Sequence, residues 1–218
     1  VFISAHCIPV GQIWLRDLVA PIKSGLASYT YGKQIGRNGV SKYSEMRVFE
    51  KYFSNFSAIP QAGYFCNNAN SAMSRKCWEA LKFNEDLTGL EDLEFAKRLN
   101  SLGEFVGYVA ESAVEHIHEE TWPQIRRRFE REAAALATFE PTLSISFGRM
   151  VSLTLKAITH DIFKSDGITF HCFVEILKYR SNQFYGSYKG STASTQYLNA
   201  MRHEYFYPTT ENRNVIIR

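Results

Sequence analysis

The order of apolar segments along the chain constrains its fold more than any other feature. Over residues 1–120, short apolar runs typical of strands alternate with longer segments that have helical spacing. Strands that alternate with helices indicate a layered α/β domain with a sheet at its centre. After Pro141 helical spacing dominates, which predicts a helical extension over residues 141–190 and a polar tail over 191–218.

The predicted elements are as follows. Strands are expected over 1–9, 28–36, the first part of 63–81, and 103–121. Helices are expected over 12–22, 44–56, the last part of 63–81, 88–99, 122–139, 145–163 and 170–190. Residues 1–9 read as one buried strand that stops at Ser4-Ala5-His6. Ser74 is placed to cap the helix that follows it, and Thr121 with Gln124 has capping-box spacing.

Charge and cysteine content exclude several classes of protein. The balance of 25 Lys+Arg against 22 Asp+Glu is only mildly basic, whereas nucleic-acid binding usually needs a clustered basic face. Cys7, Cys66, Cys77 and Cys172 form no CxxC pair, which argues against a zinc knuckle or a disulfide framework and favours a reducing compartment. We find no run of 18 apolar residues and no signal peptide, and therefore expect no transmembrane helix.

Histidines lie at the ends of two predicted strands. His6 falls where the first strand stops, and His116 and His118 fall near the end of the 103–121 segment. Ligands of open α/β sheets bind beyond the carboxyl ends of strands, and side chains at positions i and i+2 of a strand face the same way. Metal binding is one interpretation of these histidines, and hydrogen-bonded residues of a loop and an edge strand are the other.

Two adjacent carboxylates open the helix predicted from Thr88. Thr88 and Glu91 have capping-box spacing, and acidic side chains favour the positive end of the helix dipole. This local role explains Glu91. It explains Asp92 less well, because its neighbour already caps the helix, so Asp92 is a candidate for chemistry.

Four segments carry a resemblance to a known family. They are VFISAHCIPVGQIWLRDLVAPI, YGKQIG, NNANSAMSRKCWEALKFNEDLTGLEDLEFAKRL and VEHIHEETWPQIRRRFERE. In this order they resemble family 2 glycosyltransferases of the GT-A fold, and most closely bacterial enzymes that build surface polysaccharides of the cell envelope. The resemblance covers about residues 1–140 and is most specific over 67–99.

The resemblance implies a fold and a missing part. It implies that residues 1–140 form a partial GT-A domain, with a Rossmann-like mixed sheet, followed by the helical extension. The chain begins inside an apolar strand and without Met, so we expect the first strands, which bind the nucleotide in this family, to lie upstream of Val1.

The resemblance also implies an activity. Family members move a sugar from a nucleotide-diphospho-sugar to a saccharide or a polyprenyl-linked acceptor, and inversion at the anomeric carbon is expected here. The Asp of the Glu-Asp pair is the usual base, which corresponds to Asp92, with Glu91 orienting the acceptor. Such enzymes act in the cytoplasm, in some cases at the inner face of the plasma membrane.

One departure concerns the metal. Ser4-Ala5-His6 stands where the family usually has Asp-x-Asp, so dependence on Mn or Mg is uncertain. His6 is the candidate substitute ligand, together with His116. Imidazole suits Mn or a later metal better than Mg.

Further candidates for substrate binding lie elsewhere in the chain. Lys33 and Gln34 are expected in a loop that contacts the donor, and Asn70 is expected to bind sugar hydroxyls. Arg127 and Arg128, on the helix after His118, are candidates to neutralise the leaving diphosphate. For each, a role on the surface or in a turn is the alternative.

Alternative interpretations remain open at this point. The chain is alternatively a non-catalytic GT-A relative that binds a sugar or a nucleotide, or a nucleotidyltransferase-like enzyme with an upstream phosphate loop. The apolar and basic helix over 147–163 either lies on a membrane surface, where lipid-linked acceptors are found, or packs against the rest of the chain.

Overall fold

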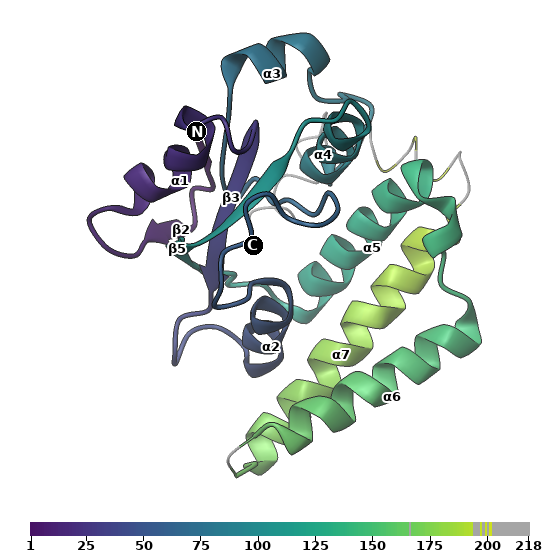
Figure 1. The fold of residues 1–218 in the computed structure, drawn as a ribbon. Coiled ribbons are helices and arrows are strands. Elements are labelled where there is room, and N and C mark those ends of the chain that lie inside the picture. The colour runs from purple at the N-terminus through teal and green to yellow at the C-terminus, as the bar shows by residue number, and fades with distance from the viewer. Residues whose placement is uncertain (166, 194–196, 198, 200, 202–218) are drawn as a thin grey trace, which may run out of the picture. The chain divides into compact units, whose positions relative to one another are not determined.

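The computed structural model describes residues 1–165, 167–193, 197, 199 and 201. The described residues form a mixed α/β structure with a five-stranded sheet and seven α-helices (Figure 1). They divide into two compact units, and each is described by itself. The first unit contains 1–84 and 91–119, and the second contains 85–90 and the described residues from 120 onward.

The first unit contains the whole sheet. Its strands are β1 (Phe2–Ile3), β2 (Cys7–Pro9), β3 (Tyr29–Ile35), β4 (Asn70–Met73) and β5 (Val106–His116). Its helices are α1 (Trp14–Lys23), α2 (Tyr43–Tyr52), α3 (Arg75–Leu81) and α4 (Glu91–Ser101). The cap predicted at Ser74 is confirmed, because its side chain accepts a hydrogen bond from the backbone N–H of Cys77.

The sheet has the strand order β1-β4-β3-β5-β2, and only β3 and β5 run parallel. Because these two central strands are parallel, their carboxyl ends lie at the same edge of the sheet. This edge carries Gln34 and Ile35 on β3 beside Val114 and Glu115 on β5. The mixed sheet predicted from the sequence is therefore confirmed.

The first nine residues differ from the prediction of one buried strand. They form two short strands, β1 and β2, which pair with β4 and β5 at opposite edges of the sheet. Ile3 and Ile8 are exposed, because an edge strand of this length has little of the sheet to pack on. The turn between the two strands carries His6.

A bulge fixes the register of β3 on β5. The pairing shifts between Gly32 and Gln34, so that Gly32 pairs with Val109 and Gln34 with Val114. A Cβ atom on Gly32 would lie 2.1 Å from the carbonyl oxygen of Ser112. Only glycine fits here, because the bulged part of β5 contacts the β3 backbone directly.

An aromatic cluster forms the core of this unit. Tyr29, Tyr31, Phe53, Phe95 and Tyr108 are all buried, and their rings make edge-on or tilted contacts. These residues come from β3, β5, α4 and the end of α2, so they hold the helices on the sheet.

The second unit is helical. It contains α5 (Trp122–Phe139), a short 3₁₀ helix (Pro141–Leu143), α6 (Phe147–Phe163) and α7 (Phe170–Ser191). The capping box predicted before α5 is present at Thr121 and Gln124. The sequence predicts a first domain that ends at residue 140, whereas the first compact unit ends at Glu119.

Close packing of helices explains this boundary. A Cβ atom on Gly186 or Gly190 of α7 would lie within 2.3 Å of a backbone oxygen of α5, so α5 and α7 pack backbone to backbone. In α6, Asp161 is completely buried and both of its carboxylate oxygens accept hydrogen bonds from Arg180 of α7. The helix over 122–139 therefore belongs with the helical extension.

Two sequence predictions concern membranes and the tail. Among the described helices, none combines the length and the apolar content needed to span a bilayer. The polar tail predicted over 191–218 lies largely outside the described residues.

Candidate functional site

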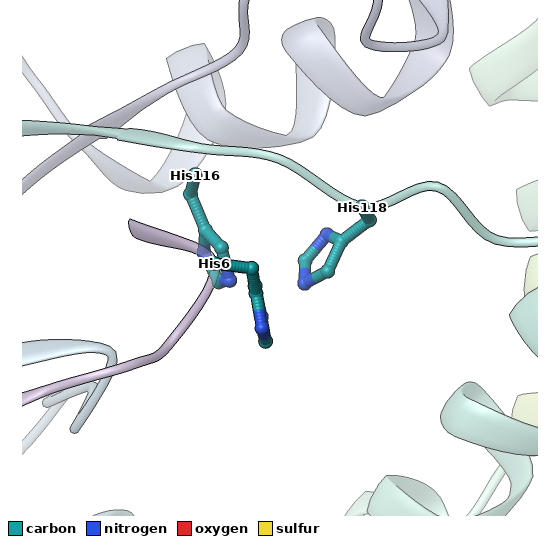
Figure 2. A group of neighbouring side chains, drawn as sticks. All are labelled: His6, His116 and His118. Carbon is teal, nitrogen blue, oxygen red and sulfur yellow. The ribbon is translucent and has the colours of Figure 1, made fainter. Parts of the chain in front are cut away.

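Three histidines meet in the first unit. His6 lies in the turn between β1 and β2, His116 is the last residue of β5, and His118 follows two residues later. One ring nitrogen of each lies within 4.8 Å of one ring nitrogen of the other two. Figure 2 shows the ring of His6 against that of His116 and the ring of His118 beside them. We call these three residues the histidine cluster.

The sheet topology brings the histidine cluster together. β2 pairs antiparallel with β5 so that Cys7 lies opposite His116, which places the preceding residue, His6, at the end of β5. The rings of His6 and His116 stack with centroids 4.8 Å apart. His6 is exposed, His116 is buried and His118 is partly buried, so the histidine cluster extends from the interior to the surface.

A hydrogen-bonded chain orients His116. Its Nδ1 lies 2.6 Å from Oε1 of Gln34, whose amide nitrogen donates to Oδ1 of Asn67 at 2.8 Å. Because Oε1 of Gln34 can only accept, Nδ1 of His116 carries the proton and Nε2 presents its lone pair. Gln34 is buried on β3, so the structure corrects the prediction that it lies in a loop, and its contact with the donor stays a prediction.

A buried carboxylate orients His118. Oε1 of Glu45, on α2, lies 2.7 Å from Nδ1 of His118, and Glu45 is only 2% exposed. The carboxylate fixes the proton on Nδ1 and leaves Nε2 as the ligand atom, as in the carboxylate–histidine pairs of metal sites. Sequence reasoning missed Glu45. The one available signal was its position four residues before Phe49, on the buried face of a predicted helix.

The donor set of the histidine cluster fits a transition metal. Three neutral imidazoles without a carboxylate among them suit zinc, iron, nickel or copper, whereas magnesium and calcium prefer oxygen. The exposure of His6 leaves room for a further ligand from solvent or substrate. The residues present therefore fit a divalent metal, but they favour a later one over Mg.

Asp92 lies in the first turn of α4 and is 7% exposed. Its Oδ2 accepts a hydrogen bond of 2.6 Å from the backbone N–H of Asn68, and its Oδ1 accepts one of 2.8 Å from that of Leu93. The helix begins at Glu91 and not at Thr88 as predicted, because Leu90 has a φ of 57°, in the left-handed region. The predicted capping box is therefore wrong.

Burial sets the basicity of Asp92. Desolvation raises the pKa of this carboxyl from 3.8 to about 7, and the neighbouring charge of Glu91 adds to the shift. Backbone N–H groups, those of Asn68, Leu93 and Asp92 itself, oppose the shift but do not cancel it. A carboxylate with a pKa near 7 is well matched to accept a proton at neutral pH.

One turn joins Asp92 to the histidine cluster. Asn67 accepts the hydrogen bond from Gln34, which contacts His116, and the next residue, Asn68, donates its backbone N–H to Asp92. The side chain of Asn68 also accepts from the hydroxyl of buried Tyr29. The turn at Asn67 and Asn68 thus connects the two groups with candidate chemistry. The strand predicted in the first part of 63–81 lies after this turn, as β4, and not before it.

Asn70 has a different role from the predicted contact with sugar hydroxyls. It is completely buried, its Oδ1 accepts from the indole of Trp14, and its Nδ2 donates to the carbonyl oxygen of Ser112. Both ends of the amide are therefore bound within the protein. The side chain holds the bulge of β5 against β4 and α1, and a structural role replaces the predicted one.

Lys33 and the two arginines lie at other places. Lys33 is on β3 and not in a loop, and its ammonium group donates to Oδ1 of Asn55. Arg127 is exposed on α5, and Arg128 pairs with Glu120. Both arginines belong to the second unit, so their predicted contact with a diphosphate stays a prediction.

The chain was compared with known protein families, curated proteins and solved structures. No protein-family model, no curated protein and no solved structure matches this chain. The function is therefore inferred from the site itself.

Proposed function

We propose that this chain belongs to an inverting family 2 glycosyltransferase with the GT-A fold, acting in bacterial surface polysaccharide synthesis. It moves a sugar from a nucleotide-diphospho-sugar to a saccharide or a lipid-linked acceptor. The observation that carries the proposal is the connection of Asp92, with its pKa near 7, to the histidine cluster through the Asn67–Asn68 turn. The resemblance over residues 67–99 supports the same assignment.

Asp92 acts as the base in this proposal. It takes the proton from an acceptor hydroxyl while the acceptor oxygen forms its bond to the anomeric carbon. The bond from that carbon to the diphosphate oxygen breaks, and its electron pair leaves with the diphosphate. Attack from the face opposite the leaving group inverts the anomeric centre, and only one carboxylate is needed.

The histidine cluster is the site for the leaving diphosphate. His6, His116 and His118 would hold a divalent metal, and a bound metal supplies positive charge that neutralises the departing diphosphate. Gln34 and Glu45 keep the Nε2 lone pairs of His116 and His118 available, as described above. Arg127 and Arg128 remain candidates for further positive charge.

Substitution of Asp92 tests the proposal. The natural full-length protein that carries these residues is incubated with a panel of nucleotide-diphospho-sugars and a saccharide extract of its host, and release of nucleoside diphosphate is measured. We expect Asp92→Asn to lower turnover by about 10²-fold or more, the usual scale for general-base catalysis.

A matched control variant shows whether the loss of turnover is specific to Asp92. Glu79→Gln also removes one carboxylate, but from the exposed surface of α3, and should leave turnover unchanged. Turnover of Asp92→Asn close to wild type would remove Asp92 from the role of base. Binding of a nucleoside diphosphate without any turnover would favour the alternative, a non-catalytic GT-A relative.

The proposed place of action is the cytoplasm, at the inner face of the plasma membrane. Lipid-linked acceptors are found there, and the described helices of this chain do not themselves cross the bilayer. α6 is the candidate for a peripheral membrane contact, because its apolar Phe147 and Leu155 are exposed.

A further inference from the structure

A cavity of about 480 Å³ lies between the end of β3 and α2, all within the first unit. Small-molecule sites commonly have volumes of roughly 300–1,000 Å³, so the cavity is large enough for a small ligand. Its walls combine the aromatic rings of Phe49 and Phe53 with charged and amide side chains. Neither Asp92 nor the histidine cluster lines it.

The cavity has an excess of positive charge. Lys33 and Arg47 line it, against the single carboxylate of Glu50, with which Arg47 pairs. An ammonium group has three N–H donors, and Asn55 accepts from that of Lys33 at 2.6 Å. The remaining N–H groups of Lys33 are donors for an anionic oxygen in the cavity.

The other wall groups suit a sugar ring. The amides of Asn38 and Asn55 and the carboxylate of Glu50 match hydroxyl groups, which both donate and accept hydrogen bonds. Phe49 and Phe53 are largely buried and add a small apolar area to the wall. This combination of amides, aromatic rings and cations distinguishes the cavity from a site for a simple anion.

The cavity shares two wall residues with the histidine cluster. Gln34 lines the cavity and contacts His116. Phe49 also lines it, and its ring stacks on those of His116 and His118, with centroids 5.6 Å and 6.3 Å apart. A ligand in the cavity would therefore lie one aromatic ring away from the proposed diphosphate site.

We propose that this cavity binds an acidic sugar residue of the acceptor saccharide, separate from the residue whose hydroxyl reacts at Asp92, and recognises its anionic group, either a carboxylate or a phosphate. Lys33 and Arg47 bind the anionic oxygens, and the amides hold the sugar ring. This inference rests on the proposed function, because it assigns the cavity to the acceptor of that reaction. It specifies the substrate class as an acidic saccharide.

Binding measured without turnover tests this inference. The natural full-length protein is titrated with glucuronic acid, glucose 6-phosphate, glucose and inorganic phosphate, and binding is followed by ligand-observed NMR. We expect at least one of the two acidic sugars to bind at least about tenfold more tightly than both glucose and inorganic phosphate, since hydrogen bonds to charged oxygens are stronger than those to neutral hydroxyls. Comparison of the carboxylate with the phosphate identifies which anionic group is recognised.

Variants locate the binding in the cavity. Lys33→Gln and Arg47→Gln should each weaken binding of the preferred acidic sugar about tenfold or more. Lys51→Gln removes a charge from the same helix as Arg47 but outside the cavity, and should leave binding unchanged. Circular dichroism identifies a variant that fails to fold. The other of the two variants then shows whether the acidic sugar binds in the cavity. Binding that weakens with salt in the wild type supports the inference without any substitution.

The results that would overturn this inference differ from those that would overturn the transferase proposal. Equal binding of glucose and the acidic sugars, binding of inorganic phosphate as tight as that of the acidic sugars, or unchanged binding in both Lys33→Gln and Arg47→Gln would overturn the acidic-saccharide assignment. Asp92→Asn should retain the binding, because Asp92 does not line the cavity. If Asp92→Asn loses turnover while no acidic sugar binds, the transferase stands and this inference fails.

Discussion

At the scale of single residues, Asp92 is under two opposing influences. Its position at the N-terminus of α4 and its two backbone N–H contacts favour the ionised carboxylate. Burial and the adjacent Glu91 favour the protonated form, and burial is the larger effect, so the pKa rises to about 7. The sequence shows the helix dipole but not the burial, which depends on the whole fold. The raised pKa of Asp92 could therefore be inferred only from the structure.

The pKa of Asp92 predicts a pH dependence. A base acts only when ionised, so kcat/KM should fall as the pH drops below about 7, by about tenfold per pH unit in the acid limit. Glu91→Gln removes the neighbouring negative charge, and the inflection should move to lower pH. The pH profiles of the two proteins provide the measurement. An inflection near pH 4 in the wild type would contradict the assignment.

Glu45, which forms a hydrogen bond with His118, leads to a second prediction. Glu45→Gln should lower the affinity for Zn²⁺ by about 10–100-fold, the usual effect of losing a group that orients a metal ligand, although Glu45 itself would not touch the metal. Isothermal titration of the natural protein with ZnCl₂ measures this affinity. His6→Ala should also weaken binding, and MgCl₂ should give little heat.

A control separates this effect from a general loss of acidic groups. Glu79→Gln, on the exposed surface of α3, should leave Zn²⁺ affinity at the wild-type value. If Glu45→Gln binds Zn²⁺ as tightly as the wild type does, then the carboxylate does not orient His118 toward a metal.

At the scale of elements, the sequence predicted the helices better than the edges of the sheet. The helical spacing in 145–163 and 170–190 led directly to α6 and α7, and the capping signals at Ser74 and Thr121 were confirmed. Residues 1–9 were misread, because a short apolar run has the same pattern whether it forms one central strand or two edge strands. The pairing of the second piece with β5 is what brings His6 to His116.

The bulge beside Gly32 leads to a prediction about the stability of the pairing between β3 and β5. Gly32→Ala should destabilise the protein by about 1–3 kcal/mol or more, because the added Cβ would overlap the carbonyl oxygen of Ser112 and the amide of Asn70. Denaturant unfolding measures the change. Zn²⁺ affinity should fall as well, since Gln34 follows the bulge and orients His116.

The chain offers a matched glycine as the control. A Cβ on Gly148, in the first turn of α6, meets no atom within 4 Å, so Gly148→Ala should change stability by less than about 1 kcal/mol. Equal stability of Gly32→Ala and the wild type would show that the bulge adapts to a side chain.

At the scale of the whole molecule, the α/β sheet unit carries Asp92 and the histidine cluster, and the helical unit carries an exposed apolar surface. On α6, Phe147, Leu155 and Phe163 are each more than half exposed. Asp161, the acidic residue of this helix, is buried against Arg180. The exposed charged side chains of α6 are therefore basic: Arg149 and Lys156.

This combination predicts binding to anionic lipid. Vesicles that contain phosphatidylglycerol should bind the natural protein in a sedimentation assay, and neutral phosphatidylcholine vesicles should bind it much less. Phe147→Ser combined with Leu155→Ser should lower binding about tenfold or more. Equal sedimentation of this double variant and the wild type would show that α6 does not contact the lipid.

The histidine cluster and Asp92 act together on one substrate in the proposed reaction, and a structure with bound ligand tests this most directly. Crystals of the natural full-length protein grown with Zn²⁺ or Mn²⁺ and a nucleoside diphosphate would locate the metal, the diphosphate and Asp92 together. We predict the metal on His6, His116 and His118, the diphosphate bound to it, and the Asp92 carboxylate facing the open space beside the diphosphate. A diphosphate bound elsewhere, or Asp92 on the opposite surface from the histidine cluster, would contradict the account.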